Sequence, residues 1–412
     1  MPLYPRLVEP RIVEALRDTP VVLLHGPRQS GKTTLARVLG RKLRYPYFSL
    51  DDDVLRAAAA DDPVGFVGDL PRRAILDEVQ RAPAIFSALK SAVDRRRSPG
   101  RFLLTGSANV MLLPALADSL AGRLGILRLH PLAQVELERG GAGFLSALFD
   151  RAFPMRRRER LGAALADRVV AGGYPAALAR RKASRRMAWY RDYVETLVQR
   201  DVRDLAKIHS LHVLPRLLAL AAGRTACLFN VSELAAPFQL SRPTIADYVT
   251  VLGRVFLLDE LPPWHSNRLS RLIKTPKLHL GDAGLAAALL GLDARTLRED
   301  RGALGQLLET FVFQELRRQA SAGAEEYRFF HFRDRDGAEV DLVIERGAGE
   351  VAGVEVKASA TVSPGDFQGL RKLRAAAGKR FRAGIVLHDG ETSVPFGEGF
   401  HAVPLRRLWD QS

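Results

Sequence analysis

The stretch that decides the fold of this 412-residue chain reads Gly26-Pro27-Arg28-Gln29-Ser30-Gly31-Lys32-Thr33 and continues with Thr34. It matches the pattern G-x-x-x-x-G-K-T. The apolar run Val21–Leu24 before it predicts a buried parallel strand, and the residues from Thr33 to Leu39 predict the start of a helix. The order of strand, glycine-rich loop and helix predicts a phosphate-binding loop for ATP or GTP.

The residue types of this loop suit the chemistry of a nucleotide phosphate. The glycines allow successive backbone N–H groups to point inward, and the helix N-terminus adds a partial positive charge. Lys32 is expected to reach the β- and γ-phosphates, and the Thr33 hydroxyl is expected to bind Mg²⁺. We therefore expect Gly26–Thr34 to bind ATP or ADP with Mg²⁺ as cofactor.

Two further strands complete the predicted nucleotide site. Ala74–Glu78 is an apolar strand that ends in two carboxylates, a Walker B pattern in which Asp77 would hold Mg²⁺ and Glu78 would act as general base. The strand 101–107 ends in small polar residues, so Ser107 or Asn109 would sense the γ-phosphate unless they simply form a polar loop. Such sites gather at the C-terminal ends of parallel strands.

The motifs together resemble the AAA+ superfamily, and more narrowly a group of uncharacterised prokaryotic ATPases joined to a C-terminal domain of unknown function. The matching segments are the phosphate loop, Asp77–Gln80 with Pro83, Leu104–Ser107, Leu120–Arg123, Gly172–Pro175, Tyr193–Glu195 and Arg200–Val202. The resemblance implies that Arg123 acts as an arginine finger and that Pro175 contacts nucleotide from a helical lid. The alternatives are a surface charge and a helix-breaking turn.

Composition indicates a globular protein with more than one domain. The chain is 47% apolar and 26% charged, and its length exceeds what one hydrophobic core usually serves. Cys227 is the single cysteine, which excludes a disulfide framework. The first residues lack the apolar core of a secretion signal, and no run is long enough to span a membrane. We expect a cytoplasmic protein without a membrane partner.

The charge balance favours an anionic partner. The net charge is +16, with a pI of about 10.4, and nucleic acid is the simplest partner for such a chain. The alternative is an arginine-rich composition without functional meaning. Basic clusters at Arg95–Arg97, Arg156–Arg158 and 180–186 equally suit solvated helix faces.

The middle of the chain predicts helices followed by a winged helix. Residues 185–226 show helical periodicity, and Asn230–Ala235 begins with a capping residue. The segment 241–249 resembles a recognition helix with Ser241 as N-cap, which would place Arg242 and Thr244 at DNA. The strand 255–258 and the basic stretch 267–274 would form the wing. A packing module is the open alternative.

The last third holds a second group of chemical residues: Glu309 on a predicted helix, Asp341 on one strand, and Glu355 with Lys357 on the next. Strand alternation puts Glu355 and Lys357 on one face. The order resembles the PD-(D/E)XK nuclease fold, which implies that Glu309, Asp341 and Glu355 bind Mg²⁺ or Mn²⁺ beside Lys357. Strand-edge carboxylates paired with a lysine, or an inactive domain of this fold, are the alternatives.

These features predict an α/β chain of four parts. They are a parallel-sheet AAA+ domain (1–155), a helical lid (156–225), a winged helix (226–290) and a restriction-endonuclease-like α/β domain (291–412). The leading function is an ATP-driven switch or motor that controls the C-terminal module. An ATP-locked DNA-binding scaffold and an ATP-gated nuclease stay open, as does assembly into a homo-oligomer.

Overall fold

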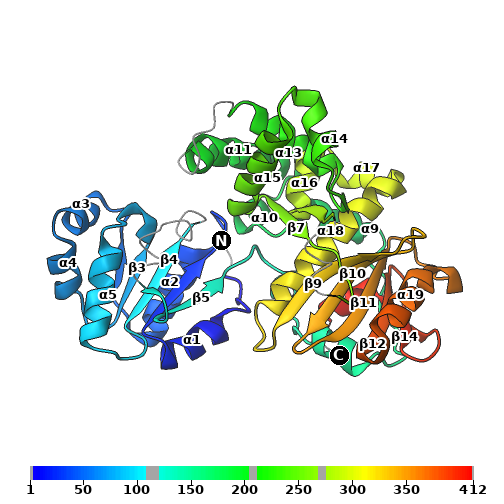
Figure 1. Ribbon diagram of the computed structural model, residues 1–412, viewed down its shortest axis with the longest axis horizontal. Helices are drawn as coiled ribbons and strands as arrows, with labels where there is room; N and C mark the ends of the chain where they lie inside the picture. The colour runs from blue at the N-terminus through cyan, green and yellow to red at the C-terminus, as the bar shows by residue number, and fades with distance from the viewer. Residues whose placement is uncertain (1–2, 108–119, 204–210, 268–274, 411–412) are drawn as a thin grey trace. The chain divides into compact units, whose positions relative to one another are not determined.

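The computed structural model describes residues 3–107, 120–203, 211–267 and 275–410, and Figure 1 shows the course of the chain. The described chain divides into two compact units. The N-terminal unit comprises Pro5–Leu132 together with Arg254–Phe256, and the C-terminal unit comprises Ala133–Gly253 and Leu257–Ser412, with the first residues of the chain. Asn109 and nearly all of the predicted basic wing segment lie outside the described residues.

The N-terminal unit is built on a five-stranded sheet in the order β2-β3-β4-β1-β5, and every neighbouring pair is parallel. Its strands are β1 (Val21–His25), β2 (Tyr47–Ser49), β3 (Ala74–Asp77), β4 (Phe102–Gly106) and β5 (Leu124–Arg128). Its helices are α1 (Glu9–Asp18), α2 (Lys32–Leu43), α3 (Asp53–Asp61), α4 (Pro63–Asp69) and α5 (Ile85–Arg95). The predicted parallel-sheet α/β fold is confirmed for this unit.

Apolar side chains of β1 enter two different cores. Val21 and Leu23 belong to the core that contains α5, whereas Val22 and Leu24 belong to the core that contains α1 and α2. Because both faces of the strand are covered, the strand is a continuous apolar run and shows no alternation.

The N-terminal unit ends at Leu132, earlier than the boundary at 155 that the sequence suggested. The short helices α7 (Gln134–Leu137) and α8 (Phe144–Asp150) belong to the C-terminal unit instead. The physical reason is that α8 buries Phe144, Leu145, Leu148 and Phe149 and packs on strands and a helix of that unit.

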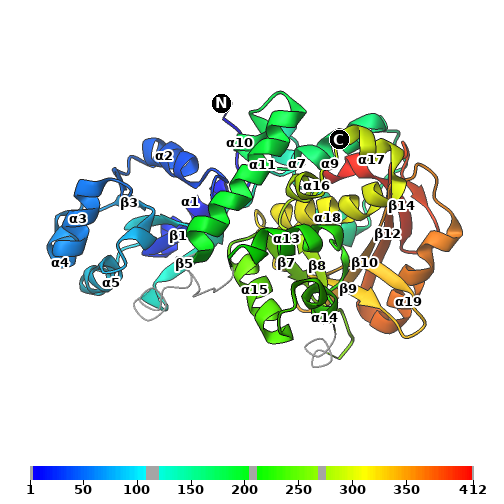
Figure 2. The ribbon, with the colours of Figure 1, turned by 90° about the horizontal axis from the view of Figure 1, so that it is seen from above.

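The helices of the predicted lid also belong to the C-terminal unit. They are α9 (Ala163–Ala171), α10 (Pro175–Leu178), α11 (Ala183–Leu197), the π-helix η3 (Val198–Val202) and α13 (Val213–Gly223). Helices α9, α11 and α13 all pack against α16 (Ala283–Leu290), whose neighbour is α17 (Ala294–Glu299). Segments far apart in the sequence thus share one helical layer, seen from above in Figure 2.

A small antiparallel sheet follows α13. Its strands β6 (Cys227–Leu228), β7 (Leu258–Leu261) and β8 (Lys277–Leu280) lie in the order β6-β8-β7, and α14 (Val231–Ala235) and α15 (Arg242–Arg254) lie between β6 and β7 in the chain. The predicted strand 255–258 begins only at Leu258, because the left-handed backbone of Phe256 (φ 63°) interrupts it.

A six-stranded mixed sheet closes the C-terminal unit in the order β13-β14-β12-β11-β10-β9. Its chain order is α18 (Arg301–Ala320), β9 (Tyr327–Arg333), β10 (Glu339–Arg346), β11 (Glu350–Lys357), α19 (Gln368–Ala377), β12 (Phe381–His388), β13 (Val394–Pro395) and β14 (Phe400–Pro404). Strand β10 is antiparallel to both of its neighbours, β9 and β11, whereas β11, β12 and β14 are parallel.

A buried histidine links the small sheet to α18. His279 on β8 is fully buried, and its Nδ1 lies 3.0 Å from Oγ1 of Thr310, which in turn lies 2.8 Å from Oγ1 of Thr225. Burial, and secondarily the charge of Lys277, lowers the pKa of His279 to about 3. The imidazole is therefore neutral in the folded chain.

This burial predicts an acid-sensitive C-terminal unit. Because the folded pKa lies below the unfolded value near 6.5, the stabilisation is complete above pH 6.5 and is lost as the pH falls below it. Between pH 7 and pH 5 the loss is about 2 kcal/mol, and His279→Gln should remove most of it. Urea unfolding followed by tryptophan fluorescence measures this, since all three tryptophans (Trp189, Trp264, Trp409) lie in the C-terminal unit. Equal pH dependence in parent and variant would contradict the assignment.

Candidate functional site

The loop after β1 requires its two glycines. Gly26 has φ 155°, and a Cβ there would lie 2.2 Å from the carbonyl oxygen of Leu129. Gly31 has φ 102° and is the N-cap of α2, a backbone geometry that L side chains rarely adopt. Close packing at one end and a left-handed turn at the other therefore shape the loop.

The loop is held by its own lysine. Lys32 is 4% exposed, and its Nζ donates to the carbonyl oxygens of Gly26 (3.0 Å) and Pro27 (2.9 Å). Ser30 is buried, and its hydroxyl donates to Pro27 O at 2.9 Å. The Arg6 guanidinium donates to Ser30 O (2.8 Å) and to His130 O (2.6 Å), so a residue that no motif singled out clamps the loop from outside.

Asp77 is the centre of the site, as the Walker B pattern predicts. It is 2% exposed at the end of β3 and accepts hydrogen bonds from the hydroxyls of Thr33 (2.8 Å), Tyr47 (2.5 Å) and Thr105. Burial and this carboxylate raise the pKa of Tyr47 to about 12, so the phenol stays a donor. Thr33 and Asp77 thus present adjacent oxygens of the kind that Mg²⁺ prefers.

Glu78 occupies a strained backbone position beside Asp77. Its φ is 58°, in the left-handed region, and its N–H donates to Thr105 Oγ1 at 3.2 Å. Gln80 bridges it to β4, because its Nε2 donates both to Glu78 Oε2 and to Ser107 Oγ (3.1 Å). Strain of this kind persists only where surrounding contacts impose it, and it is common at catalytic positions.

Arg123 and Pro175 are not brought to this loop within the N-terminal unit. Arg123 directly precedes β5, at the opposite edge of the sheet, and forms an ion pair with Asp94 (Nε–Oδ1 2.5 Å). A strand of five residues, about 17 Å long, separates that edge from the nucleotide loop, so an arginine finger at Arg123 would act in a neighbouring subunit or after closure. An arginine finger acting in a neighbouring subunit stays a prediction.

Pro175 begins α10 in the C-terminal unit. The glycine pair before it serves internal packing, because Gly173 N donates to Asp282 Oδ2 (2.8 Å) and a Cβ on Gly172 would meet Asp282 Oδ1 at 2.0 Å. Asp282 also pairs with Arg318 (2.9 Å) and caps α16. A contact of Pro175 with nucleotide stays a prediction.

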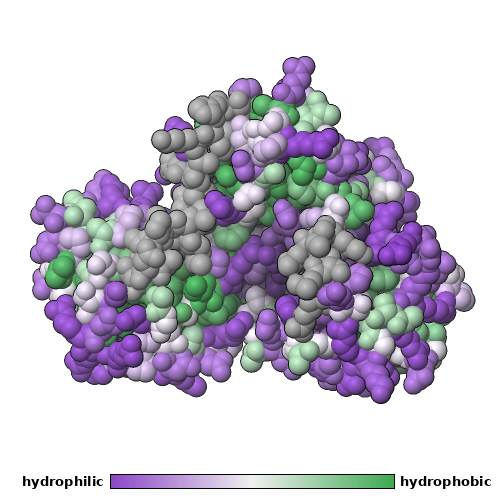
Figure 3. All heavy atoms as spheres, in the orientation of Figure 1, coloured by the Kyte–Doolittle hydropathy of each residue, from purple (hydrophilic) through white to green (hydrophobic). Residues whose placement is uncertain are grey.

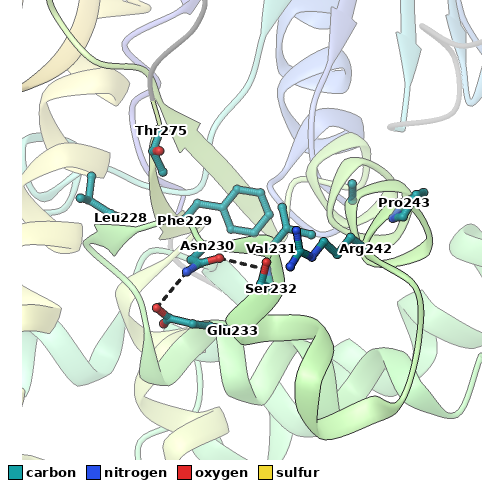
Figure 4. A pocket seen from close by; sticks show the side chains of 10 residues that line it. Leu228, Phe229, Asn230, Val231, Ser232, Glu233, Arg242, Pro243 and Thr275 are labelled. Atoms are coloured by element: carbon teal, nitrogen blue, oxygen red, sulfur yellow. Dashed lines mark hydrogen bonds between the residues drawn. The ribbon is translucent and has the colours of Figure 1, made fainter.

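The predicted DNA-contacting residues lie at the start of α15. Arg242 is exposed and, with Pro243, lines a pocket beside the start of α14, where Asn230 Oδ1 accepts from Ser232 N at 3.0 Å (Figure 4). Thr244 lies with its hydroxyl 2.8 Å from that of Ser241, whose Oγ also accepts from Thr244 N (3.2 Å). Ser241 thus caps the helix, and Arg242 beside it is exposed to solvent.

The second predicted cluster also forms, with an added member. Lys277 on β8 is 5% exposed, and its Nζ lies 2.8 Å from Glu309 Oε1 and 3.5 Å from Asp341 Oδ1. Asp341 Oδ2 accepts from Val356 N at 2.9 Å, and Lys357 Nζ lies 3.0 Å from Glu355 Oε1. Glu355 Oε2 is buried without a hydrogen-bond partner.

The charges of this cluster do not balance. Three carboxylates face two ammonium groups, and burial followed by the charge of Asp341 raises the pKa of Glu355 to about 8 and that of Glu309 well above its usual value. Burial alone would lower the pKa of Lys277, but the negative charges of Glu309 and Asp341 outweigh burial and raise that pKa. The buried cation is therefore an ammonium.

The expectation of a divalent ion at these carboxylates stays a prediction. Across the described ranges, no group of three or more His, Cys, Asp or Glu side chains is arranged to hold a metal ion. Lys277, which belongs to none of the sequence motifs, lies between Glu309 and Asp341. No helix in the described parts of the chain is both long and apolar enough to cross a membrane.

The fold and the loop geometry define a P-loop nucleotide-binding unit of the AAA type joined to a distinct C-terminal unit. Models of protein families match accordingly: an AAA domain at residues 18–138, a domain of unknown function (DUF8612) at 162–296 and a second one (DUF4143) at 304–408. Uncharacterized proteins of Mycobacterium bovis and Mycobacterium tuberculosis are each 30% identical over 400 residues, covering 97% of this chain and 83% of theirs. The chain belongs to the same family as these two mycobacterial proteins.

Solved structures give weaker likenesses. A Walker-type ATPase of Pyrococcus abyssi is 15% identical, with a TM-score of 0.42 over 68% of this chain and 94% of that one. A RuvB protein of Thermotoga maritima is 20% identical, with a TM-score of 0.30 over 62% of this chain and 89% of that one. The family assignment rests on the mycobacterial relatives and the matched domains.

Lys277→Met is predicted to make the C-terminal unit respond to divalent cations. Removing the ammonium leaves the carboxylates without a compensating positive charge. For a buried ion pair, such a loss typically lowers the free energy of unfolding by about 3–5 kcal/mol. Mn²⁺ should restore much of the lost thermal midpoint, read by tryptophan fluorescence, while leaving the parent unchanged.

Lys357→Met is the matched control, since this amine is about one-third exposed and lies beside Glu355. It should lose less stability. A Lys277→Met variant whose midpoint does not respond to Mn²⁺ would show that the carboxylates do not surround a single cation position.

Proposed function

We propose that the protein is a Mg²⁺-dependent ATPase that works as a conformational switch, in which nucleotide binding and hydrolysis in the N-terminal unit control the C-terminal unit. The observation that carries the proposal is the hydrogen-bonded chain beside the phosphate loop. It joins Thr33 to Asp77, Asp77 to Thr105, and Glu78 through Gln80 to Ser107.

This series of hydrogen bonds supports hydrolysis because the residues around the phosphate loop each suit a role in phosphoryl transfer. Lys32 would exchange the carbonyl oxygens of Gly26 and Pro27 for the β- and γ-phosphates, a change that needs only side-chain rotation. Thr33 and Asp77 would hold Mg²⁺, with Tyr47 fixing the carboxylate. Glu78 would orient and deprotonate the attacking water, with Gln80 and Ser107 setting its position.

The topology of the C-terminal unit supports a DNA-binding and nuclease-like module as the controlled part. The order α13-β6-α14-α15-β7-β8, with β8 central in the small sheet, is typical of a winged helix, and Arg242 at the start of α15 suits a DNA contact. The order α18-β9-β10-β11-α19-β12 with Glu309, Asp341, Glu355 and Lys357 suits the PD-(D/E)XK fold.

One observation favours binding over cleavage in this module. Lys277 occupies the position between Glu309 and Asp341 that a catalytic cation would need, and it is almost fully buried there. The second candidate function is therefore a DNA-binding scaffold that ATP locks in one conformation with little turnover. Steady-state hydrolysis separates it from the switch, and cleavage of plasmid DNA with Mn²⁺ would indicate an ATP-gated nuclease.

Glu78→Gln is predicted to keep nucleotide binding while lowering ATP turnover by about 10² or more, the scale of general-base loss. Lys32→Ala should weaken binding itself, because the buried ammonium is the phosphate-facing charge. Phosphate release and the affinity for a fluorescent ATP analogue measure the two effects.

Glu14→Gln is a matched control, because Glu14 is an exposed residue of α1 and the substitution removes the same charge. It should leave turnover and binding unchanged. ATP hydrolysis by Glu78→Gln at the parent rate would remove Glu78 from the mechanism, and no hydrolysis by the parent at all would favour the locked scaffold.

A further inference from the structure

The N-terminal edge of the five-stranded sheet is lined with arginines. Because the strands are parallel, their first residues lie together at the edge opposite the nucleotide loop. Arg73 directly precedes β3, Arg101 directly precedes β4, and Arg123 directly precedes β5. Arg44 caps the end of α2 just before β2, and Arg17 lies in the last turn of α1 before β1.

Most of the arginines at this edge are exposed and lack a carboxylate partner. The exposed set forms no ion pair with a carboxylate in the described ranges, in contrast to Arg123, which pairs with Asp94. Its members are Arg17, Arg44, Arg72, Arg73, Arg95, Arg96 and Arg97. The acids nearby in sequence are few, and Asp18 accepts a hydrogen bond from Thr19 Oγ1. We call this set the arginine edge.

Hydrophilic side chains also cover the helix that leads to this edge. On the face of the N-terminal unit that Figure 3 shows, they predominate over α5, whose last turn carries Arg95. The visible surface over α5 is therefore mostly polar.

Part of the arginine edge is concave. Arg17, Arg72 and Arg73 line one pocket together with Tyr45, Ser98 and Pro99. Arg73 lies over the Tyr45 ring at 5.7 Å, and Tyr45 is fixed by its hydroxyl, which donates to Gly100 O at 2.8 Å. The guanidinium group of Arg73 therefore packs on a ring whose position is fixed by a hydrogen bond.

The arginines repel one another. Burial, then the charges of Arg96, Arg95 and Arg72, lowers the pKa of Arg101, whose Nη1 donates to Ala92 O at 2.6 Å. Like charges gathered on four different helix-to-strand connections cost stability unless an anion relieves them. The arrangement thus favours an anionic ligand.

We propose that the arginine edge binds the phosphate backbone of double-stranded DNA. Five strands spaced about 4.8 Å apart make an edge about 20 Å wide, which spans several consecutive phosphates of a duplex. Guanidinium groups suit phosphate oxygens through paired N–H donors, whereas a single small anion would occupy the pocket alone. The surface is independent of ATP hydrolysis and of Arg242 on α15, so it goes beyond the proposed function.

The test compares two double variants of the full chain that lose the same charge. Arg72→Gln/Arg96→Gln removes two members of the arginine edge, and Arg181→Gln/Arg335→Gln removes two exposed arginines of the C-terminal unit. Fluorescence anisotropy with a duplex of about 20 base pairs is measured from about 50 to about 300 mM KCl. Each lost phosphate contact reduces the magnitude of the slope of log affinity against log salt by about 0.9. The slope of the edge variant should therefore be smaller in magnitude by about two, and its affinity at about 100 mM KCl should be about tenfold lower.

ATP binding checks that the N-terminal unit remains folded in both variants, and tryptophan fluorescence checks the C-terminal unit, which holds all three tryptophans. A larger loss in the edge variant than in the control supports the proposal. Equal losses in the two variants, no binding of duplex by the parent at the lowest salt, or binding of poly-L-glutamate in place of DNA each overturn it.

Discussion

All five strands of the N-terminal sheet run in the same direction, and this constraint organises the rest of the unit. It places Gly26, Asp77 and Ser107 at one edge, where β1, β3 and β4 end. It places the arginine edge at the other, where the same strands begin. A side chain before a strand therefore cannot serve the site after it, which is why Arg123 pairs with Asp94 and does not face the loop of its own chain.

Two buried lysines, Lys32 and Lys277, are each held by partners within their own unit. Lys32 is held by two carbonyl oxygens of its loop, which a nucleotide phosphate can displace at little cost because the donors are reused. Lys277 is held by two carboxylates, and displacing it would leave like charges exposed to one another. Lys32 can therefore exchange its carbonyl partners for a phosphate, whereas Lys277 is held in place by its carboxylates.

The sequence alone was enough to predict site residues that belong to a contiguous motif. The phosphate loop and the carboxylate pair at Asp77 and Glu78 were predicted because their partners lie within a few residues or on the next strand. Arg6, Tyr47 and Lys277 were missed because their partners lie from 24 to 124 residues away, at separations that carry no local pattern. The N-terminal contact unit ends at Leu132 and not near 155, and the sequence could not show this because the apolar face of α8 does not indicate which unit it will join. In the same way, Gly172 and Gly173 suit a nucleotide contact as a motif, yet their packing partner is the distant Asp282.

The central claim is that nucleotide in the N-terminal unit changes the C-terminal unit. Hydrogen–deuterium exchange with and without Mg²⁺ and a slowly hydrolysed ATP analogue tests it directly. The account predicts slower exchange in Gly26–Thr33 together with altered exchange in peptides of the C-terminal unit, both lost in Lys32→Ala. Changes confined to Pro5–Leu132 would contradict it.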